Sequence, residues 1–237
     1  AGYDAARMVV IPNGFDTARF RPDPAARDAV RRELGLAPET PLIGMAARFH
    51  PQKDHENLVN AAHALAHRHA EVHYALCGRD VTWQNSLLAG WIHASGLKNR
   101  FHLLGPRDDM PAVYAAADAV VLPTRYDPFA NVTLEAAAAG RAVVTTAANG
   151  ASEWLGNDVL VLRSARDARA LARAMDALVD PDRRRALGAR ARRRAQALDW
   201  ASHAGALVEE YERIVRTRRT RRTRAPASPP AEAVTAP

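Results

Sequence analysis

The feature that most constrains the fold of this chain is a repeated alternation of short apolar runs with helical patterns. Each run is nearly continuous in aliphatic residues, as is typical of parallel strands that are covered by helices on both faces. We therefore expect strands at Met8–Ile11, Pro41–Ala46, Val72–Cys77, Phe101–Leu104, Ala119–Pro123, Ala142–Thr146 and Val159–Leu162.

The segments between these runs carry helical periodicity. Alternating strands and helices predict a Rossmann-like, doubly wound parallel α/β sheet with right-handed crossovers and helices on both faces. Such sheets bind ligands in a crevice at the carboxyl ends of their strands. The expected helices are Ala25–Leu34, Glu56–Arg68, Trp83–Ala94, Met110–Ala117, Asn131–Ala139 and Ala165–Leu178.

The C-terminal part of the chain changes character. Two more helices are expected, at Asp182–Leu198 and Trp200–Val215, and the Arg/Thr repeats that follow have too little apolar surface to order themselves. We predict one domain over residues 1–216, followed by a disordered Arg- and Pro-rich tail over residues 217–237.

The overall composition and charge limit the kinds of partner and the cellular location that we expect for this protein. The net charge of +7 is concentrated in arginine-dense stretches near the C-terminus, which favours anionic partners or, alternatively, a solvated helix face and tail. A single cysteine, Cys77, excludes an intrachain disulfide. No stretch is apolar over the roughly 20 residues that cross a bilayer. We expect a cytoplasmic fragment of a longer protein.

Two segments near predicted strand ends suggest ligand contacts. Gly14 follows an expected strand within a turn and could bring the backbone close to a ligand, although a plain loop is the simpler interpretation. Arg48 and Lys53 follow the strand that ends at Ala46, with a proline turn between them. Two cations on one loop could bind a diphosphate, or they could be ordinary surface cations. His50 and His55 flank this loop and could also contact phosphate.

The segment from Leu122 to Thr146 is the most informative. A strand ends at Pro123, a polar loop contains Asp127, and a helix begins near Asn131 with Glu135 one turn in. The first amides of that helix lack internal partners and can donate to an anion. The two carboxylates could line one crevice and accept hydrogen bonds from vicinal hydroxyls. The alternative for Glu135 is stabilisation of the first helical turn.

Taken together, these segments resemble glycosyltransferase family 4, the retaining sugar-nucleotide transferases of the GT-B fold. The resemblance covers roughly Met8 to Val215 and corresponds to the second, donor-binding domain of that family. The matching text comprises "VIPNGFD", "ARFHPQKDHENLVNA", "ALCGRD", "FHLLGPRDDMPAVYAAADAVVLPT", "YDPFANVTLEAAAAGRAVVTT" and "NGASEWL".

The resemblance implies roles for particular residues. Arg48 and Lys53 correspond to the basic pair that binds the donor diphosphate. Glu135 corresponds to the second carboxylate of the family's E-x7-E signature, which holds the ribose hydroxyls, and Asp127 takes the place of the first, which faces the transferred sugar. The loop and helix start whose amides reach sugar and phosphate correspond to Phe129, Ala130, Asn131 and Val132.

The sequence also departs from the family pattern. Asp127 is one methylene shorter than the usual Glu, and Arg141-Ala142 replaces the more usual residue followed by proline. The first, acceptor-binding domain of the family is missing from the sequence. Because that domain is absent, the sequence leaves open whether this chain is active by itself.

The resemblance implies hexosyl transfer from a UDP-, GDP- or ADP-sugar to a glycan, lipid or small molecule, with retention and without metal. The expected partners are the nucleotide-sugar donor and the acceptor domain, with peripheral contact to the inner membrane face through basic residues. An alternative is a module that binds the nucleotide sugar without transfer. A nucleic-acid binder is disfavoured because no aromatic residues interleave with the basic ones in the folded part.

Overall fold

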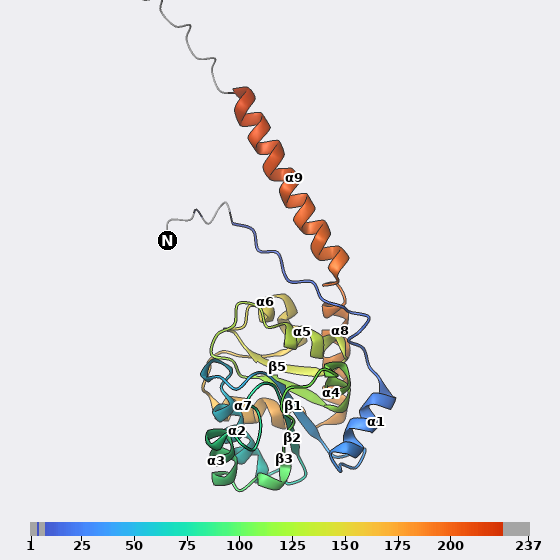
Figure 1. Cartoon of the computed structure of the whole chain (residues 1–237), viewed down its shortest axis with the longest axis vertical. Helices are drawn as coiled ribbons and strands as arrows, with labels where there is room; N and C mark the ends of the chain where they lie inside the picture. The colour runs from blue at the N-terminus through green and yellow to red at the C-terminus, as the bar shows by residue number, and fades with distance from the viewer. Residues whose placement is uncertain (1–3, 5–7, 225–237) are drawn as a thin grey trace, which may run out of the picture.

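The core of the protein is a single parallel sheet of six strands. The computed structural model describes residue 4 and residues 8–224. The strand order is β3-β2-β1-β4-β5-β6, and every neighbouring pair is parallel (Figure 1). The prediction of a doubly wound α/β fold is confirmed. The strands are β1 (Leu42–Ala46), β2 (His73–Cys77), β3 (Phe101–Leu103), β4 (Ala119–Leu122), β5 (Ala142–Thr146) and β6 (Leu160–Leu162).

The strand expected at Met8–Ile11 does not form. Met8, Val9 and Val10 are extended but are not paired with any described strand, and Val10 is 88% exposed. The aliphatic composition of this run predicts a buried strand. Because a strand is stable only where a neighbour satisfies its backbone groups and covers its side chains, composition alone was insufficient.

The helices cover both faces of the sheet. On one face α2 packs against α3 and α7, and on the other α4 and α5 pack against α1 and α8. This division follows from right-handed crossovers that run outward from β1 in both directions. The helices are α1 (Pro24–Glu33), α2 (His55–Ala66), α3 (Ser86–Ala94), α4 (Met110–Ala116), α5 (Asn131–Ala138), α6 (Ala151–Leu155), α7 (Ala168–Asp176), α8 (Pro181–Ala195) and α9 (Trp200–Arg224), with short 3-10 turns at Pro51–Lys53, Lys98–Arg100 and Gly156–Asp158.

Side-chain caps explain why two helices begin later than expected. Asn85 caps α3 by accepting a hydrogen bond from the amide of Leu88, so this helix starts at Ser86 rather than Trp83. Asp167 caps α7 in the same way, through the amide of Ala170. Asn and Asp are among the strongest N-cap residues because their oxygens satisfy the free first-turn amides.

The last helix, α9, projects away from the body of the domain (Figure 1). It continues to Arg224, whereas we expected it to end at Val215 and a disordered tail to begin at Thr217. Ion pairs one turn apart, such as Arg216 with Glu212, favour its extension. Residues 225–237 of the expected tail lie outside the described residues. No helix within the described range is both long and apolar enough to cross a membrane.

Close packing at glycine fixes the position of α8 on the sheet. Gly188 of α8 lies against the turn that joins α5 to β5, where a Cβ atom would clash with the carbonyl oxygen of Gly140. The neighbouring Ala191 and Ala195 are fully buried. Small residues therefore let α8 approach the backbone of β5.

We predict that Gly188→Ala lowers the free energy of unfolding by about 1–3 kcal/mol, because the added methyl overpacks this contact. The matched control is Gly90→Ala in α3, where nothing lies within 4 Å of an added Cβ. Alanine there should stabilise the protein by up to about 1 kcal/mol through helix propensity. Urea denaturation of both variants measures the difference. Equal stability changes would contradict the packing described for α8.

Candidate functional site

The candidate site lies where the strand order reverses. The chain moves from β1 to β2 in one direction and from β4 to β5 in the other, and β1 and β4 are adjacent. The loops that follow these two strands leave toward opposite faces of the sheet. In open α/β sheets the crevice between such loops is the usual place of ligand binding.

Hydrogen bonds hold the two loops together at this point. The backbone oxygen of Gln52 accepts from the amide of Arg125 at 2.7 Å and from the hydroxyl of Thr124 at 3.0 Å. The side-chain amide of Gln52 donates to the carbonyl of Tyr126 at 2.7 Å. Gln52 thus fixes the β1–α2 loop against the β4–α5 loop, immediately before Lys53.

Lys53 and Asp127, both predicted site residues, meet across this crevice. Their side chains form an ion pair and are 15% and 11% exposed. An ammonium group has three donors and no acceptor, so one bond to Asp127 leaves two donors for a further anion. The structure therefore brings a cation from one loop and a carboxylate from the other to the switch point.

A buried aspartate fixes the backbone next to Lys53. Asp54 has a left-handed conformation with φ of 59° and is 3% exposed. One of its carboxylate oxygens accepts from Arg125 at 2.7 Å. A non-glycine residue in this region costs free energy that the surroundings must offset, and such residues cluster at functional sites. Sequence reasoning missed this contact because the two partners are far apart in the chain.

The β5–α6 loop positions Asp127 from the other side. The amide of Asp127 donates to the carbonyl of Ala148 at 2.9 Å, and the amide of Gly150 donates to the carbonyl of Asp127 at 2.9 Å. A Cβ atom on Gly150 would clash with the carbonyl of Pro128. The segment around Gly150 therefore holds Asp127 in place.

Asn149 occupies the centre of this arrangement and was missed from the sequence. Its fully buried side chain accepts from the amides of Ala130 and Ala151, both at 3.1 Å, and donates to the hydroxyl of Thr145 at 3.1 Å. The signal in the sequence was the Asn-Gly pair directly after a strand. Its geometry shows that Asn149 joins the starts of α5 and α6 to β5.

The start of α5 keeps two amides without an intramolecular partner. The amide of Ala130 is bonded to Asn149, and that of Phe129 donates to Asp127 at 3.3 Å. In the described part of the chain the amides of Asn131 and Val132 make no hydrogen bond. Of the four predicted donors, these two remain for an anion, and the other two amides serve the loop itself.

Glu135 lies one turn further along α5, on the same face as Asn131 because the two are four residues apart. It accepts a hydrogen bond at 2.9 Å from the hydroxyl of Tyr114, which sequence reasoning did not single out. Burial raises the pKa of Glu135, while the hydrogen bond from Tyr114 and the charge of Arg19 act in the opposite direction. No contact among the described residues joins Glu135 to the Lys53–Asp127 pair.

Arg48 is exposed and follows directly on β1. Its side chain forms no hydrogen bond or ion pair with another described residue. Gly78, with φ of 148°, allows this path because a Cβ atom would clash with the carbonyl of Ala47. The Arg48 guanidinium is therefore free of intramolecular partners, as expected of a ligand-binding cation, but its ligand stays a prediction.

Gly14 is buried against the beginning of α9. A Cβ atom there would lie 2.9 Å from the Cβ of His203 and 3.0 Å from the ring of Trp200. This packing accounts for the glycine. Its expected contact with a ligand stays a prediction.

The two histidines of the loop have structural roles. Nδ1 of His50 accepts from the amide of Gln52 at 3.2 Å and caps the 3-10 turn. Burial, assisted by the charge of Lys53, lowers the pKa of His55 to about 4. His55 is therefore neutral at pH 7, and the expected contact of His50 or His55 with phosphate stays a prediction. Within the described residues no three His, Cys, Asp or Glu side chains are grouped as metal ligands would be.

Comparison with known proteins supports the resemblance to glycosyltransferases. The model of the family described as "Glycosyl transferases group 1" matches residues 40–181. A D-inositol 3-phosphate glycosyltransferase from Kineococcus radiotolerans is 32% identical over 236 residues, covering 92% of this chain and 54% of that protein. A GDP-mannose-dependent alpha-(1-6)-phosphatidylinositol monomannoside mannosyltransferase from Mycobacterium tuberculosis is 32% identical over 201 residues, covering 79% and 51%.

Solved structures of glycosyltransferases have a similar fold. HepE from Anabaena, determined in complex with UDP-glucose, has a TM-score of 0.79 at 26% identity and covers 89% of this chain and 59% of that chain. The C-terminal domain of the group 1 protein LpcC from Francisella tularensis has a TM-score of 0.67 at 22% identity, covering 78% of this chain and 97% of that domain, and shows the shared fold.

The Rossmann-like parallel sheet with helices on both faces is the architecture of a GT-B domain. The chain belongs to the group 1 glycosyltransferases and corresponds to their C-terminal GT-B domain, which confirms the resemblance. It spans about half the length of the curated relatives it matches.

We predict that Glu135→Gln raises the melting temperature at pH 7. Because the folded-state pKa of Glu135 is raised, the folded protein holds this proton more tightly than the unfolded chain does. Stability is therefore lost as the pH rises from the usual value of 4.5 through the raised pKa, and the uncharged amide avoids this loss.

Thermal unfolding of both proteins from pH 4 to pH 8 measures the effect. The melting temperatures of the two proteins, plotted against pH, should converge below about pH 4.5, where the carboxyl of Glu135 is protonated in both the folded and the unfolded state. A difference that is constant across this range would show that burial of the Glu135 charge is not its cause.

Proposed function

We propose that this domain binds a nucleoside diphosphate sugar at the β1–β4 switch point and, within a complete GT-B enzyme, takes part in hexosyl transfer with retention of configuration. The observation that carries the proposal is the convergence of Lys53, Asp127 and the start of α5 at one point of the sheet. HepE, which shares the fold, has been solved with UDP-glucose. The base, the sugar and the acceptor of this protein are left open.

The charge distribution suits the leaving diphosphate. Breakage of the bond at the anomeric carbon leaves negative charge on the diphosphate, and donors already in place stabilise this charge without reorganisation. Lys53 has two unused donors, Arg48 has an unpaired guanidinium, and the amides of Asn131 and Val132 are unpaired at the N-terminus of α5. These groups supply the electrostatic stabilisation that a metal ion supplies in other transferases.

The carboxylates suit the sugar parts of the donor. In the proposal Asp127 faces the transferred hexose, and Glu135 accepts hydrogen bonds from the ribose hydroxyls. The hydroxyl of Tyr114 holds one oxygen of Glu135, which leaves the other oxygen for a ligand. Burial of Glu135 without a cationic partner in contact fits a group that is reserved for neutral hydroxyls.

Transfer also requires a site for the acceptor. The matched relatives are about twice as long as this chain, and in the proposal an N-terminal acceptor domain completes the cleft. α9 exposes Val208, Tyr211, Ile214 and Val215, which gives it an apolar surface suited to such a domain. The alternative is that the chain alone binds the donor without transfer.

We predict that Lys53→Ala and Glu135→Ala each weaken donor binding by roughly tenfold or more, since each removes hydrogen bonds that involve a charged group. The measurement is calorimetric titration with UDP-, GDP- and ADP-sugars. Lys98→Ala is the matched control, because Lys98 is an exposed lysine on the Lys98–Arg100 turn. Unchanged affinity in both site variants would contradict the proposed site.

A transfer assay on the same chain separates the two interpretations of its activity. Donor binding without turnover to any acceptor would favour the binding module. Turnover by the isolated chain would favour a complete catalytic unit.

A further inference from the structure

A second basic site lies at the edge of the sheet opposite the candidate donor site. It is a cavity of about 270 Å³ at the amino ends of β4 and β5. Asp118 and Arg141 immediately precede these two strands, whereas Lys53 and Asp127 follow the carboxyl ends of β1 and β4. The cavity is lined by Arg27, Asp118, Gly140, Arg141, Arg184 and Arg185.

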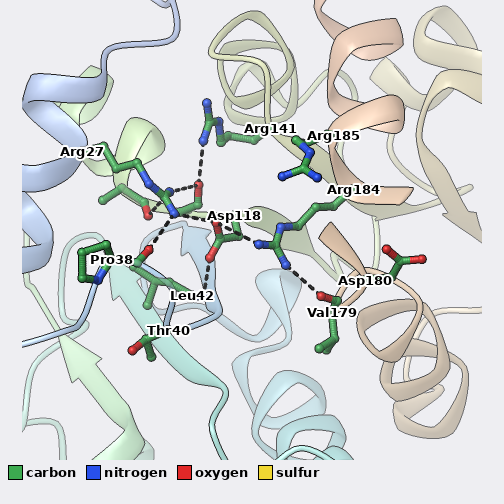
Figure 2. A network of polar contacts seen from close by, with 12 residues as sticks. Arg27, Pro38, Thr40, Leu42, Asp118, Arg141, Val179, Asp180, Arg184 and Arg185 are labelled. Carbon is green, nitrogen blue, oxygen red and sulfur yellow. Dashed lines mark hydrogen bonds and ion pairs between the residues drawn. The ribbon is translucent and has the colours of Figure 1, made fainter. Parts of the chain in front are cut away.

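The charge in this cavity is unbalanced. Four of the lining side chains are guanidiniums and one is a carboxylate. That carboxylate, Asp118, is already shared between Arg27 at 2.8 Å and Arg184 at 3.8 Å, and it also contacts the buried Arg31 at 3.4 Å. Figure 2 shows Arg27 and Arg184 reaching Asp118 from two sides, with Arg185 beside Arg184. Asp118 alone cannot neutralise this set, and Asp182, which pairs with Arg185, is exposed and lies outside the cavity lining.

Part of the cluster has a structural role. Arg27 and Arg141 donate to carbonyl oxygens at the C-terminal end of α4, with distances of 2.9 Å from Arg27 to Ala116 and 3.0 Å from Arg141 to Ala117. Cations are favourable there because the last carbonyls of a helix carry partial negative charge. These contacts explain why the two side chains are held rigidly toward the cavity.

The other two arginines keep unused donors. Arg184 donates to the carbonyl of Val179 at 2.8 Å, and Arg185 is paired with the exposed carboxylate of Asp182. A guanidinium has five N–H donors, so both side chains retain several for a ligand. Arg184 is only 16% exposed, which means that its remaining donors face a confined space.

The pKa of Arg141 reflects the same excess of positive charge in the cavity. Burial and, to a smaller extent, the charges of Arg27, Arg184 and Arg192 lower the pKa of Arg141 to about 10, opposed by Asp118. A bound anion would relieve both the repulsion and the loss of hydration.

We propose that this cavity binds the phosphoryl group of a small soluble anion. Guanidiniums from α1, from the start of β5 and from α8 approach from different directions, which matches a tetrahedral oxyanion better than a planar carboxylate. The volume lies just below the range of about 300–1,000 Å³ that is typical of pockets for larger ligands. The site therefore suits inorganic phosphate or a small phosphomonoester, and it lies at the opposite end of the strands from the candidate donor site.

The test uses the full chain with Arg48→Ala and Lys53→Ala introduced together, so that the candidate donor site does not contribute. Calorimetric titration with inorganic phosphate, at an ionic strength held constant with sodium chloride, measures binding. We expect phosphate binding to survive in this background. Its affinity should fall by about tenfold in Arg185→Gln, which removes one guanidinium, and by about a further tenfold in the double variant Arg184→Gln/Arg185→Gln.

The matched control is Arg183→Gln/Arg193→Gln, which removes the same charge from exposed positions of α8 outside the cavity. Equal affinity of the cavity and control variants would overturn the proposal, as would loss of phosphate binding in the Arg48/Lys53 background. If Arg184→Gln impairs folding, the comparison of Arg185→Gln with Arg183→Gln decides, because both side chains are exposed.

Discussion

The candidate site depends on the hydrogen bonds of Gln52 across the switch point of the sheet. The parallel ladder brings β1 and β4 together, but it only places the beginnings of their loops near each other. The backbone oxygen and the side chain of Gln52 then tie the loops along their length, at Thr124, Arg125 and Tyr126. Without these bonds, the Lys53–Asp127 and Arg125–Asp54 ion pairs would have to hold the two loops together.

Two of the residues that support this pair, Asp54 and Asn149, are more buried than the pair itself. Asp54, Asn149 and Gly150 are each fixed by contacts that tolerate little change: a left-handed backbone, a buried amide with four partners, and a glycine against a carbonyl oxygen. The proposed ligand-binding side chains, Lys53 and Asp127, are thus held in position by tightly constrained neighbours. Preorganisation of this kind lowers the cost of ordering a binding site when a charged ligand arrives.

The centre of the sheet was predictable because β1, β2, β4 and β5 are buried almost throughout and so form continuous apolar runs. The same reasoning failed at Met8–Ile11, where such a run has no neighbouring strand. At the site, Lys53 and Asp127 were predictable because they follow strand ends. Tyr114, Asn149 and the Asp54–Arg125 pair were not, since each acts through a partner from another loop or helix and leaves no periodic signal.

The helix α5 connects the two basic regions of the domain. Its N-terminus, with the free amides of Asn131 and Val132, faces the candidate donor site, and its C-terminus leads through Gly140 to the arginine-lined cavity. The dipole of α5 favours an anion at the first end and cations at the second. Arg141 and Arg192 donate to the last carbonyls of this helix, at Ala139 and Ala138, and so satisfy the groups that would repel an anion bound in the cavity. The excess of arginine at this edge thus offsets the helix dipole and still leaves positive charge in the cavity.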